Sequence, residues 1–452
     1  MTKALEGFRY LLLRRWLFLI LAFSASVRFV NLSRPKELVF DEIYYVDGAR
    51  DFLKYGVEIE KGASEFIVHP PVGKWVIASG IKLFGDNPFG WRFATALLGT
   101  VSILFVYLVA KHLFNSEKWA LLAAALVSLD GLHLVMSRTS LLDMTLMFFI
   151  LVGLYAFLKE NFWTAGFLLG LALATKWSAI YYLAFFGIYY LARDIYRIRI
   201  SKEVGRAEGA PEHRVQDYLQ ASATRTAQLA ILPVLTYIAT WFGWFKSTLG
   251  WSRNWGAENP GLLPDALRSF WHYHSEMLYF HTHLTENHNY EAKAWSWLLM
   301  YRPTSFFYET PKGCGTSSCA QEVLALGTPL LWWCAAIALV VLITFWLKNK
   351  AWNHGFILLA VAAGYLPWFV YPQRTTFTFY SIIFEPWLII CLVAVLRIYY
   401  LSSLGKQRFK FFSIIFLTSI IAANFIYHFP IFVGQILTYD DWQSLMWFKK
   451  WI

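Results

Sequence analysis

Long apolar segments separated by short polar connections run through most of the 452-residue chain. A helix needs roughly 17–25 apolar residues to cross a bilayer, and the alternation typical of a barrel strand is not visible. The pattern therefore predicts an all-α integral membrane protein with about 11 transmembrane helices. The predicted spans are 11–31, 91–113, 119–136, 141–158, 162–175, 177–192, 227–245, 328–347, 355–371, 379–396 and 411–432.

Lys and Arg in the connections predict the orientation, because cytoplasmic connections are enriched in these residues. A cytoplasmic N-terminus places most of these cations inside and the C-terminus outside. Two large extracytoplasmic loops result, 32–90 and 246–327. We interpret 1–452 as a single transmembrane domain. The predicted cytoplasmic connections are 111–118, 159–161, 193–226, 348–354 and 397–410.

The composition supports this class. Hydrophobic residues make up 58% of the chain and charged residues 15%, with a mean hydropathy of +0.44, whereas soluble domains carry about 25% charged residues. The net charge of +11 is largely explained by the cytoplasmic connections, and no nucleic-acid-binding motif is visible. Membrane lipid is therefore an expected partner, and nucleic acid is not.

Two adjacent carboxylates, Asp41 and Glu42, follow the first apolar segment. Carboxylates at a membrane boundary are costly to desolvate and commonly mark a functional site. Neighbouring side chains point in different directions, so we expect only one of the pair to face a substrate. The alternative is that Asp41 is the N-cap of an interfacial helix that starts near Ile43. Both interpretations can hold for different members of the pair.

Four cations lie at predicted outer ends of spans. Each one alone is explained by a long side chain that reaches the interface. Together they suit a lipid-linked phosphate, which arginine binds through a bidentate fork and lysine as a point charge. Asp143 is interpreted either as an ion-pair partner of Arg138 or as a helix N-cap. The four cations are Arg28, Arg92, Arg138 and Lys176.

The segment His69-Pro70-Pro71 is stiff, because proline fixes its own φ and restricts the residue before it. It is interpreted either as a plain turn before the apolar segment 75–84 or as a support that holds His69 and Lys74 near the carboxylates.

The loop 246–327 carries several histidines but no HExxH or comparable ligand set, so no metal site is predicted. Segment 294–309, which contains Arg302, is expected to be re-entrant or interfacial. Cys314 and Cys319 would form a disulfide in an oxidising compartment, with two free thiols as the alternative.

The motifs, in their order and spacing, resemble the bacterial branch of the protein O-mannosyltransferases. This family belongs to the polytopic glycosyltransferases that use lipid phosphosugars and have the GT-C fold. The matching motifs are Phe40-Asp41-Glu42, His69-Pro70-Pro71 with Lys74, Gly90-Trp91-Arg92, Ser137-Arg138 with Asp143, Thr175-Lys176-Trp177-Ser178, Phe280-His281-Thr282, His288-x-Tyr290, Trp295-Ser296-Trp297, Arg302-Pro303, Cys314 with Cys319, and Leu326-Gly327-Thr328-Pro329.

The resemblance implies mannose transfer, with inversion, from polyprenyl-phosphate mannose to Ser or Thr hydroxyls of exported polypeptides. It implies a bacterial plasma membrane, a link to the secretion translocon, and no cofactor besides the donor, and it leaves a divalent cation open. Asp41 would be the general base with Glu42 beside it. The donor phosphate would be bound by Arg28, Arg92, Arg138 and Lys176, and the site supported by His69, Lys74, Asp143, His281 and Arg302.

The chain departs from eukaryotic members, because the loop 246–327 is too short for their β-trefoil insertion. Two other functions remain open. One is a GT-C transferase that acts on a glycan or lipid acceptor. The other is a transporter of lipid-linked sugars, although the acidic pair lies in a loop and not between broken inverted repeats. No P-loop, dinucleotide-binding motif or GxSxG motif is present.

Overall fold

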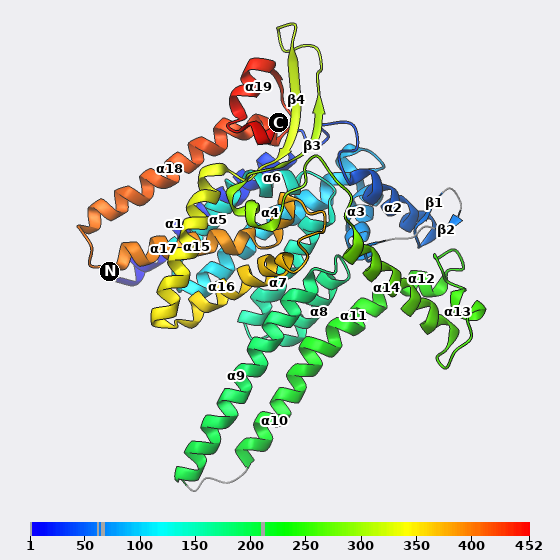
Figure 1. The fold of residues 1–452 in the computed structure, drawn as a ribbon. Helices are drawn as coiled ribbons and strands as arrows, with labels where there is room; N and C mark the ends of the chain where they lie inside the picture. Colours follow the sequence, from blue (N-terminus) through cyan, green and yellow to red (C-terminus); the bar gives the residue numbers. More distant parts are fainter. Residues whose placement is uncertain (1, 61–62, 65–67, 209–212) are drawn as a thin grey trace.

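The computed structural model describes residues 2–60, 63–64, 68–208 and 213–452 as a mostly helical molecule (Figure 1). The strands are β1 (Ile59–Glu60), β2 (Ala63–Ser64), β3 (Thr304–Glu309), β4 (Cys319–Ala325) and β5 (Ile436–Thr438). The α-helices are α1 (Thr2–Phe29), α2 (Glu42–Tyr55), α3 (Val72–Phe84), α4 (Pro88–Phe114), α5 (Glu117–Ser128), α6 (Gly131–Ser137), α7 (Leu142–Leu158), α8 (Phe162–Leu173), α9 (Ala179–Glu208), α10 (His213–Thr226), α11 (Leu232–Thr240), α12 (Phe242–Lys246), α13 (Trp255–Glu258), α14 (Asp265–His283), α15 (Pro329–Asn349), α16 (Trp352–Tyr365), α17 (Glu385–Leu401), α18 (Gln407–Phe432) and α19 (Tyr439–Leu445).

Several helices fit a multi-pass membrane protein. Within the described residues, α4, α15 and α18 are long and apolar enough to cross a membrane, and α7 and α8 are shorter apolar helices. A fourth candidate is the pair α5 and α6, if it forms one broken span. The predicted number of 11 spans stays a prediction.

The predicted span 119–136 is broken, because α5 and α6 meet at an angle of 66°. Asp130 lies at the break and explains it. One of its oxygens accepts a hydrogen bond from the His133 backbone amide (3.0 Å) and caps α6, and the other accepts from the Thr328 amide (2.9 Å) and the Trp332 indole (2.8 Å). A side-chain cap of this kind satisfies amides that a straight helix would have bonded internally.

The connection 193–226 is largely helical. Helices α9 and α10 project together from one end of the molecule (Figure 1), and residues 209–212 between them lie outside the described part. The predicted spans 162–175 and 177–192 imply a tight reversal between them at the surface, and residues 174–178 do separate α8 from α9. This reversal is not at the surface, however, because Thr175 and Lys176 are both buried.

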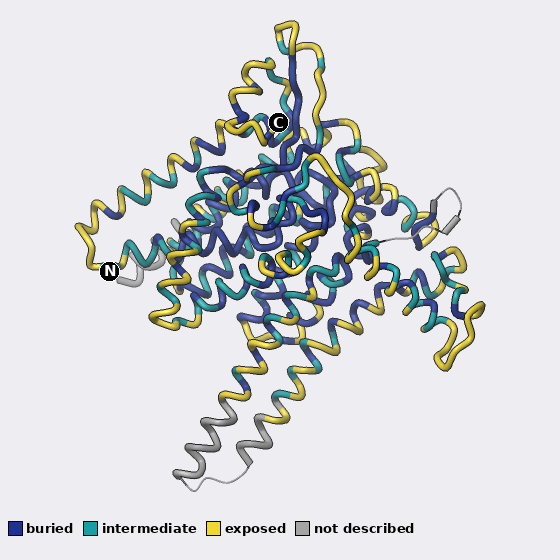
Figure 2. Tube along the Cα trace, in the orientation of Figure 1, coloured by how far each residue is buried: buried dark blue, intermediate teal, exposed yellow. Residues whose placement is uncertain are grey.

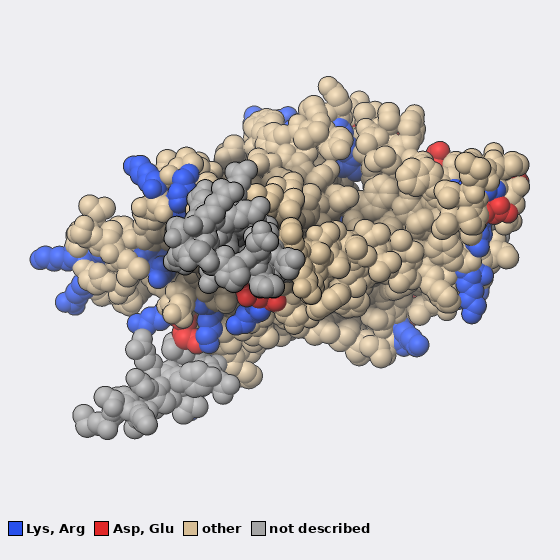
Figure 3. Space-filling view, turned by 90° about the horizontal axis from the view of Figure 1, so that it is seen from below, with Lys and Arg blue, Asp and Glu red and all other residues tan. Residues whose placement is uncertain are grey.

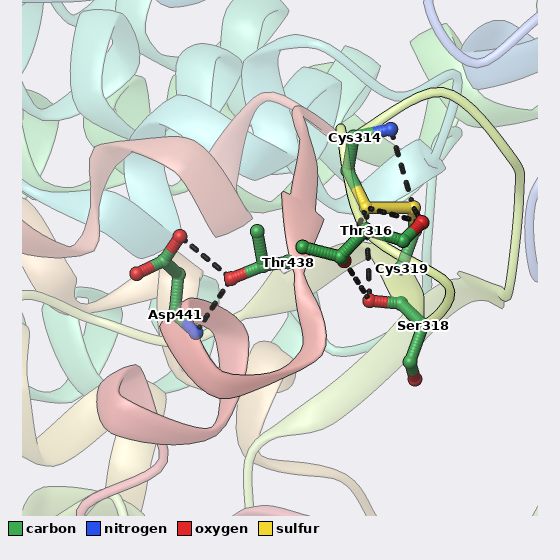
Figure 4. Close-up of a disulfide and its surroundings, with 6 residues drawn as sticks. All are labelled: Cys314, Thr316, Ser318, Cys319, Thr438 and Asp441. Atoms are coloured by element: carbon green, nitrogen blue, oxygen red, sulfur yellow. Dashed lines mark hydrogen bonds between the residues drawn. A yellow bond between two sulfur atoms is a disulfide. The ribbon is translucent and has the colours of Figure 1, made fainter.

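A small sheet departs from the predicted all-α fold. Strand β3 pairs antiparallel with β4, and β4 with β5. Segment 294–309 is therefore not one re-entrant segment, because its last six residues form β3. Their sequence, Thr-Ser-Phe-Phe-Tyr-Glu, is rich in aromatic and hydroxyl residues that suit a strand. A disulfide between Cys314 and Cys319 closes the loop between β3 and β4 (Figure 4).

The core lies where the central helices cross, whereas much of α18 is exposed (Figure 2). Every residue from 378 to 394, which includes the segment before α17 and the first ten residues of α17, is buried. Helix α3 approaches α4 closely through two glycines. A Cβ added at Gly80 would meet the carbonyl oxygen of Gly90, so the two backbones are in direct contact there.

We predict that Gly80→Ala destabilises the protein by about 1–3 kcal/mol, because the added methyl group forces α3 away from α4. The matched control is Gly187→Ala on α9, where a Cβ would meet nothing within 4 Å. The thermal midpoint in detergent should fall for the first variant and stay level or rise for the second. Equal midpoints for the two variants would contradict this packing.

Candidate active site

Glu42 and Arg92 form a fully buried ion pair at the start of α2. Arg92 donates from Nε and Nη2 to the two oxygens of Glu42, at 2.8 and 2.7 Å. The carboxylate also accepts from the amides of Val39 (3.0 Å) and Ser140 (2.8 Å). Both oxygens are thus occupied by protein groups, so Glu42 holds the loop in place and does not face a cavity.

Asp41 stands at the N-cap position of α2, but its side chain makes no cap hydrogen bond. One of its oxygens accepts instead from the Tyr45 hydroxyl, at 3.4 Å. Burial raises the pKa of Asp41 to about 6; Lys176 opposes this rise and Asp143 adds to it. The carboxylate is therefore poised to gain or lose a proton near neutral pH, as a general base must.

Phe40, directly before Asp41, has φ 48°, in the left-handed region that non-glycine residues rarely adopt. Its ring stacks on Phe306 of β3 with centroids 4.9 Å apart, and it meets Phe377 and Phe379 edge-on at 5.8 and 5.6 Å. These contacts hold the unusual backbone. Strain of this kind occurs where the surrounding structure fixes a functional residue.

A cavity of about 460 Å³ is lined in part by Lys176, the cation that interacts electrostatically with Asp41. It is formed by the α8–α9 connection, by α14 and by segment 368–374, with His69 from the stiff turn on one side. Its wall is mostly aromatic and apolar, with two cations, which suits a ligand that has both a lipid and a charged part. The lining residues are His69, Leu173, Lys176, Trp177, Ser178, Ile180, Tyr181, Tyr237, His274, Leu278, His281, Thr282, Trp368, Tyr371 and Arg374.

Lys176 is the first of the cavity cations. Its ammonium group contacts both oxygens of Asp143, at 2.9 and 3.1 Å, and lies 4.5 Å from the centre of the Tyr380 ring. The pairing of Asp143 with Arg138 is therefore wrong, because Asp143 pairs with Lys176, from the connection that follows α8. The alternative, Asp143 as the helix N-cap, is wrong as well, because Leu141 occupies the N-cap position of α7. The sequence suggested the neighbour along the chain, but the tertiary fold brings a closer cation.

Arg374 is the second cation, and the sequence reasoning missed it. Its Nε donates to the backbone carbonyl of His281 (2.9 Å). Its Nη1 is buried and has no hydrogen-bond partner in the described part of the chain. A buried guanidinium nitrogen without a partner is costly, so it marks a place for an anion. The available signal was the position of Arg374 between the predicted spans 355–371 and 379–396, in a connection that the alternation of spans places outside, against the charge rule.

The other predicted phosphate ligands lie elsewhere. Arg138 donates to the backbone carbonyls of Val27, Arg28, Val30 and Asn31 at 2.8–3.0 Å, and so caps the end of α1. The role of Arg28, Arg92 and Arg138 in phosphate binding stays a prediction, and the geometry does not favour it.

Arg28 and Arg92 are fully buried. Arg28 contacts the ring of His133 at 2.8 Å and the hydroxyl of Ser24 at 2.8 Å. Arg92, beyond its ion pair, donates to the carbonyl of Pro35 at 2.6 Å. None of these arginines lines the cavity.

The supporting residues divide into two groups. His69 and His281 line the cavity and stack with ring centroids 5.3 Å apart. Burial lowers the pKa of both, that of His281 to about 4, so both rings are neutral at physiological pH. Lys74 forms a buried ion pair with Glu58 next to this turn. Arg302 lies outside the cavity and donates to the carbonyl of Ile452 at 2.7 Å.

Within the described residues, no group of three or more His, Cys, Asp or Glu side chains is arranged to hold a metal ion. The arrangement that is present consists of a carboxylate with a pKa near neutrality and, in electrostatic contact with it, Lys176, which lines a cavity together with Arg374. Such a site can accept a proton from one reactant and stabilise negative charge on another.

Two family models match the chain. The model described as dolichyl-phosphate-mannose-protein mannosyltransferase matches residues 68–207, and that of the C-terminal four TMM region of protein-O-mannosyltransferase matches residues 266–451. The polyprenol-phosphate-mannose–protein mannosyltransferase of Mycolicibacterium smegmatis is 31% identical over 96% of this chain and 92% of its own length. The protein of that name from Corynebacterium glutamicum is 29% identical, with the same coverage.

Solved structures agree on the fold. The Saccharomyces cerevisiae protein O-mannosyltransferase Pmt1–Pmt2 complex, bound to the sugar donor, matches with a TM-score of 0.79 at 15% identity, covering 97% of this chain and 92% of that one. ArnT from Cupriavidus metallidurans, bound to undecaprenyl phosphate, matches with a TM-score of 0.56 at 19% identity over 90% and 63%. This chain therefore belongs to the protein O-mannosyltransferase family of GT-C glycosyltransferases.

Proposed function

We propose that this enzyme transfers mannose from polyprenyl-phosphate mannose to Ser or Thr hydroxyls of exported polypeptides, with inversion at the sugar carbon and Asp41 as the general base. One observation carries the proposal: the Asp41 carboxylate, with a pKa raised to about 6, interacts electrostatically with Lys176, which lines a cavity together with Arg374. The relatives named polyprenol-phosphate-mannose–protein mannosyltransferases support this choice of donor and acceptor.

The donor phosphate binds between Lys176 and Arg374. Arg374 offers its unpartnered Nη1, and Lys176 offers an ammonium already oriented by Asp143. The apolar wall, including Leu173 and Ile180, accepts the first part of the lipid chain. Phosphate is a weakly basic leaving group, so these cations stabilise its developing charge and no general acid is needed.

The acceptor hydroxyl approaches from the side of Asp41. Its oxygen forms a bond to the anomeric carbon as the bond from that carbon to the phosphate oxygen breaks. The hydroxyl proton moves to a carboxylate oxygen of Asp41, and the products are the mannosylated polypeptide and polyprenyl phosphate. A single displacement needs one base and inverts the configuration, whereas two-carboxylate hydrolases work differently. Glu42 takes no part, because its oxygens are occupied.

The cavity and Asp41 face the outside of a bacterial plasma membrane in this proposal, with the N-terminus in the cytoplasm and the C-terminus outside. The support is the distribution of Lys and Arg among the connections. Polypeptides would then be modified as they leave the secretion translocon, before they fold over their acceptor residues.

Asp41→Asn should abolish transfer and leave donor binding intact, because the amide keeps the shape of the side chain but cannot accept the proton. A loss of about 10²–10⁴ in rate is expected. Labelled mannose transfer to a Ser/Thr-rich peptide, with membranes that contain excess labelled donor, measures this. The matched control is Asp47→Asn on the same helix, whose side chain is exposed. Near-normal turnover by the Asp41 variant would overturn the role of this residue. Label on a glycan or lipid, with none on peptide, would move the acceptor to that class.

Transfer should depend on pH with an apparent pKa of about 6. The base works only when unprotonated, so the single-turnover rate should rise about tenfold per pH unit below this value and level off above it. Rates measured about two units either side of the midpoint, under saturating donor, would show the inflection. A rate that is flat across this range, or that falls as the pH rises through it, contradicts the assignment.

Arg374→Gln should lower kcat by about 10²-fold, since it removes a cation from the leaving phosphate. The loss should also weaken donor binding, measured with a fluorescent donor analogue. Arg408→Gln, an exposed residue at the start of α18, is the matched control and should behave as wild type. Unchanged kcat and donor affinity in the Arg374 variant would place the phosphate elsewhere.

A further inference from the structure

A second large cavity, of about 610 Å³, lies at the opposite end of α8 from Lys176. We name it the α7–α8 cavity, because the connection between these helices forms one wall. Helix α8 has 12 residues and is therefore about 18 Å long, so the two cavities are well separated. The lining residues are His112, Phe157, Leu158, Lys159, Glu160, Phe162, Tyr189, Tyr190, Arg193, Trp352 and Phe356.

Arg193 is the residue of this cavity that is best placed to bind a ligand. Its guanidinium lies 4.0 Å from the centre of the Tyr190 ring. Its Nε and Nη2 atoms are buried, yet neither has a hydrogen-bond partner in the described structure. A guanidinium held on a ring face with two buried donors unused is preorganised for a bidentate anion.

The acids beside this cavity form no ion pair with Arg193 in the described structure. Asp194 pairs with Arg225 at 3.3 Å. The guanidinium of Arg225 also contacts the Tyr190 ring, 4.8 Å from its centre. Of the described acids, neither Asp194 nor Glu160 forms an ion pair with Arg193. Lys159 adds a second cation at the cavity, and Glu160 is the one carboxylate among the lining residues.

The surroundings indicate a membrane lipid and not a soluble anion. Tyr189 and Trp352 line the cavity and are themselves partly exposed, as aromatic residues at the headgroup level of a membrane are. The cavity draws on connections 111–118, 159–161, 193–226 and 348–354 or the helix ends next to them, which the charge pattern assigns to the cytoplasmic side. Figure 3, viewed from the end where α9 and α10 project, shows Lys and Arg around this face with few Asp or Glu.

We propose that the α7–α8 cavity binds the phosphate headgroup of an anionic phospholipid, with Arg193 as the bidentate ligand and Lys159 as the second cation. Basic pockets between helix ends on the cytoplasmic side are known to take such headgroups. The acyl chains would lie along the exposed apolar surface beside Tyr189 and Trp352. This site is independent of mannose transfer, because no residue of it belongs to the candidate active site.

The test uses the full-length protein, purified in a neutral detergent, with phosphatidylglycerol added in mixed micelles. Binding is measured by native mass spectrometry and by the rise in thermal midpoint. Phosphatidylglycerol should bind saturably, phosphatidylcholine should not, and Arg193→Gln should weaken binding about tenfold through the loss of charge-assisted hydrogen bonds. The matched control Arg408→Gln should bind as wild type does.

A second variant and a second ligand complete the test. Lys159→Gln changes an exposed side chain, so it should fold normally and still weaken binding severalfold, even if the Arg193 variant is unstable. Inorganic phosphate, tested alone, should bind far more weakly than phosphatidylglycerol. Equal binding of phosphatidylglycerol to wild type and both variants would overturn the site, and equal affinity for inorganic phosphate would overturn the assignment to lipid.

Discussion

The buried ion pair between Glu42 and Arg92 is the interaction on which the position of the reactive carboxylate depends. It joins α2 to α4, and its remaining hydrogen bonds reach Ser140 before α7 and Pro35 in the loop after α1. Removing one partner would leave an uncompensated buried charge, at a cost of about 3–5 kcal/mol. Asp41 is the residue before Glu42, so its position near Lys176 is set by a neighbour that takes no part in the chemistry.

The sequence located the acidic pair and predicted that its members differ in role, because adjacent side chains diverge. It could not decide which acid is which, since that depends on where Arg92 arrives from fifty residues away. It also grouped the cations by their place at span ends. Arg138 shows why this was insufficient: four backbone carbonyls at the end of α1 occupy it, and a sequence does not show which carbonyls a fold leaves unpaired. Arg374, nearly two hundred residues from Lys176, carried too weak a local signal.

The helical character of the fold followed directly from the apolar segments, and several helices of the expected kind are present. The sheet did not follow, because its strands are short and β5 lies more than a hundred residues after β4. Pairing at that separation leaves no periodic trace in the chain. The break at Asp130 was hidden for a related reason. A single polar residue within an apolar segment gives no indication that Thr328 and Trp332 will meet it.

The balance of charge around the cavity has a consequence for the energetics of transfer. Two acids, Asp41 and Asp143, are set against two bases, Lys176 and Arg374. In the proposed reaction the proton of the acceptor hydroxyl neutralises the Asp41 carboxylate. At the same time the phosphodiester of the donor becomes a phosphate monoester, which carries one more negative charge. The total charge of the reacting groups is unchanged, so the step only moves one negative charge from Asp41 to the phosphate, beside the cations. A largely apolar cavity tolerates such an internal displacement of charge far better than the creation of a new ion, which would need solvent to stabilise it.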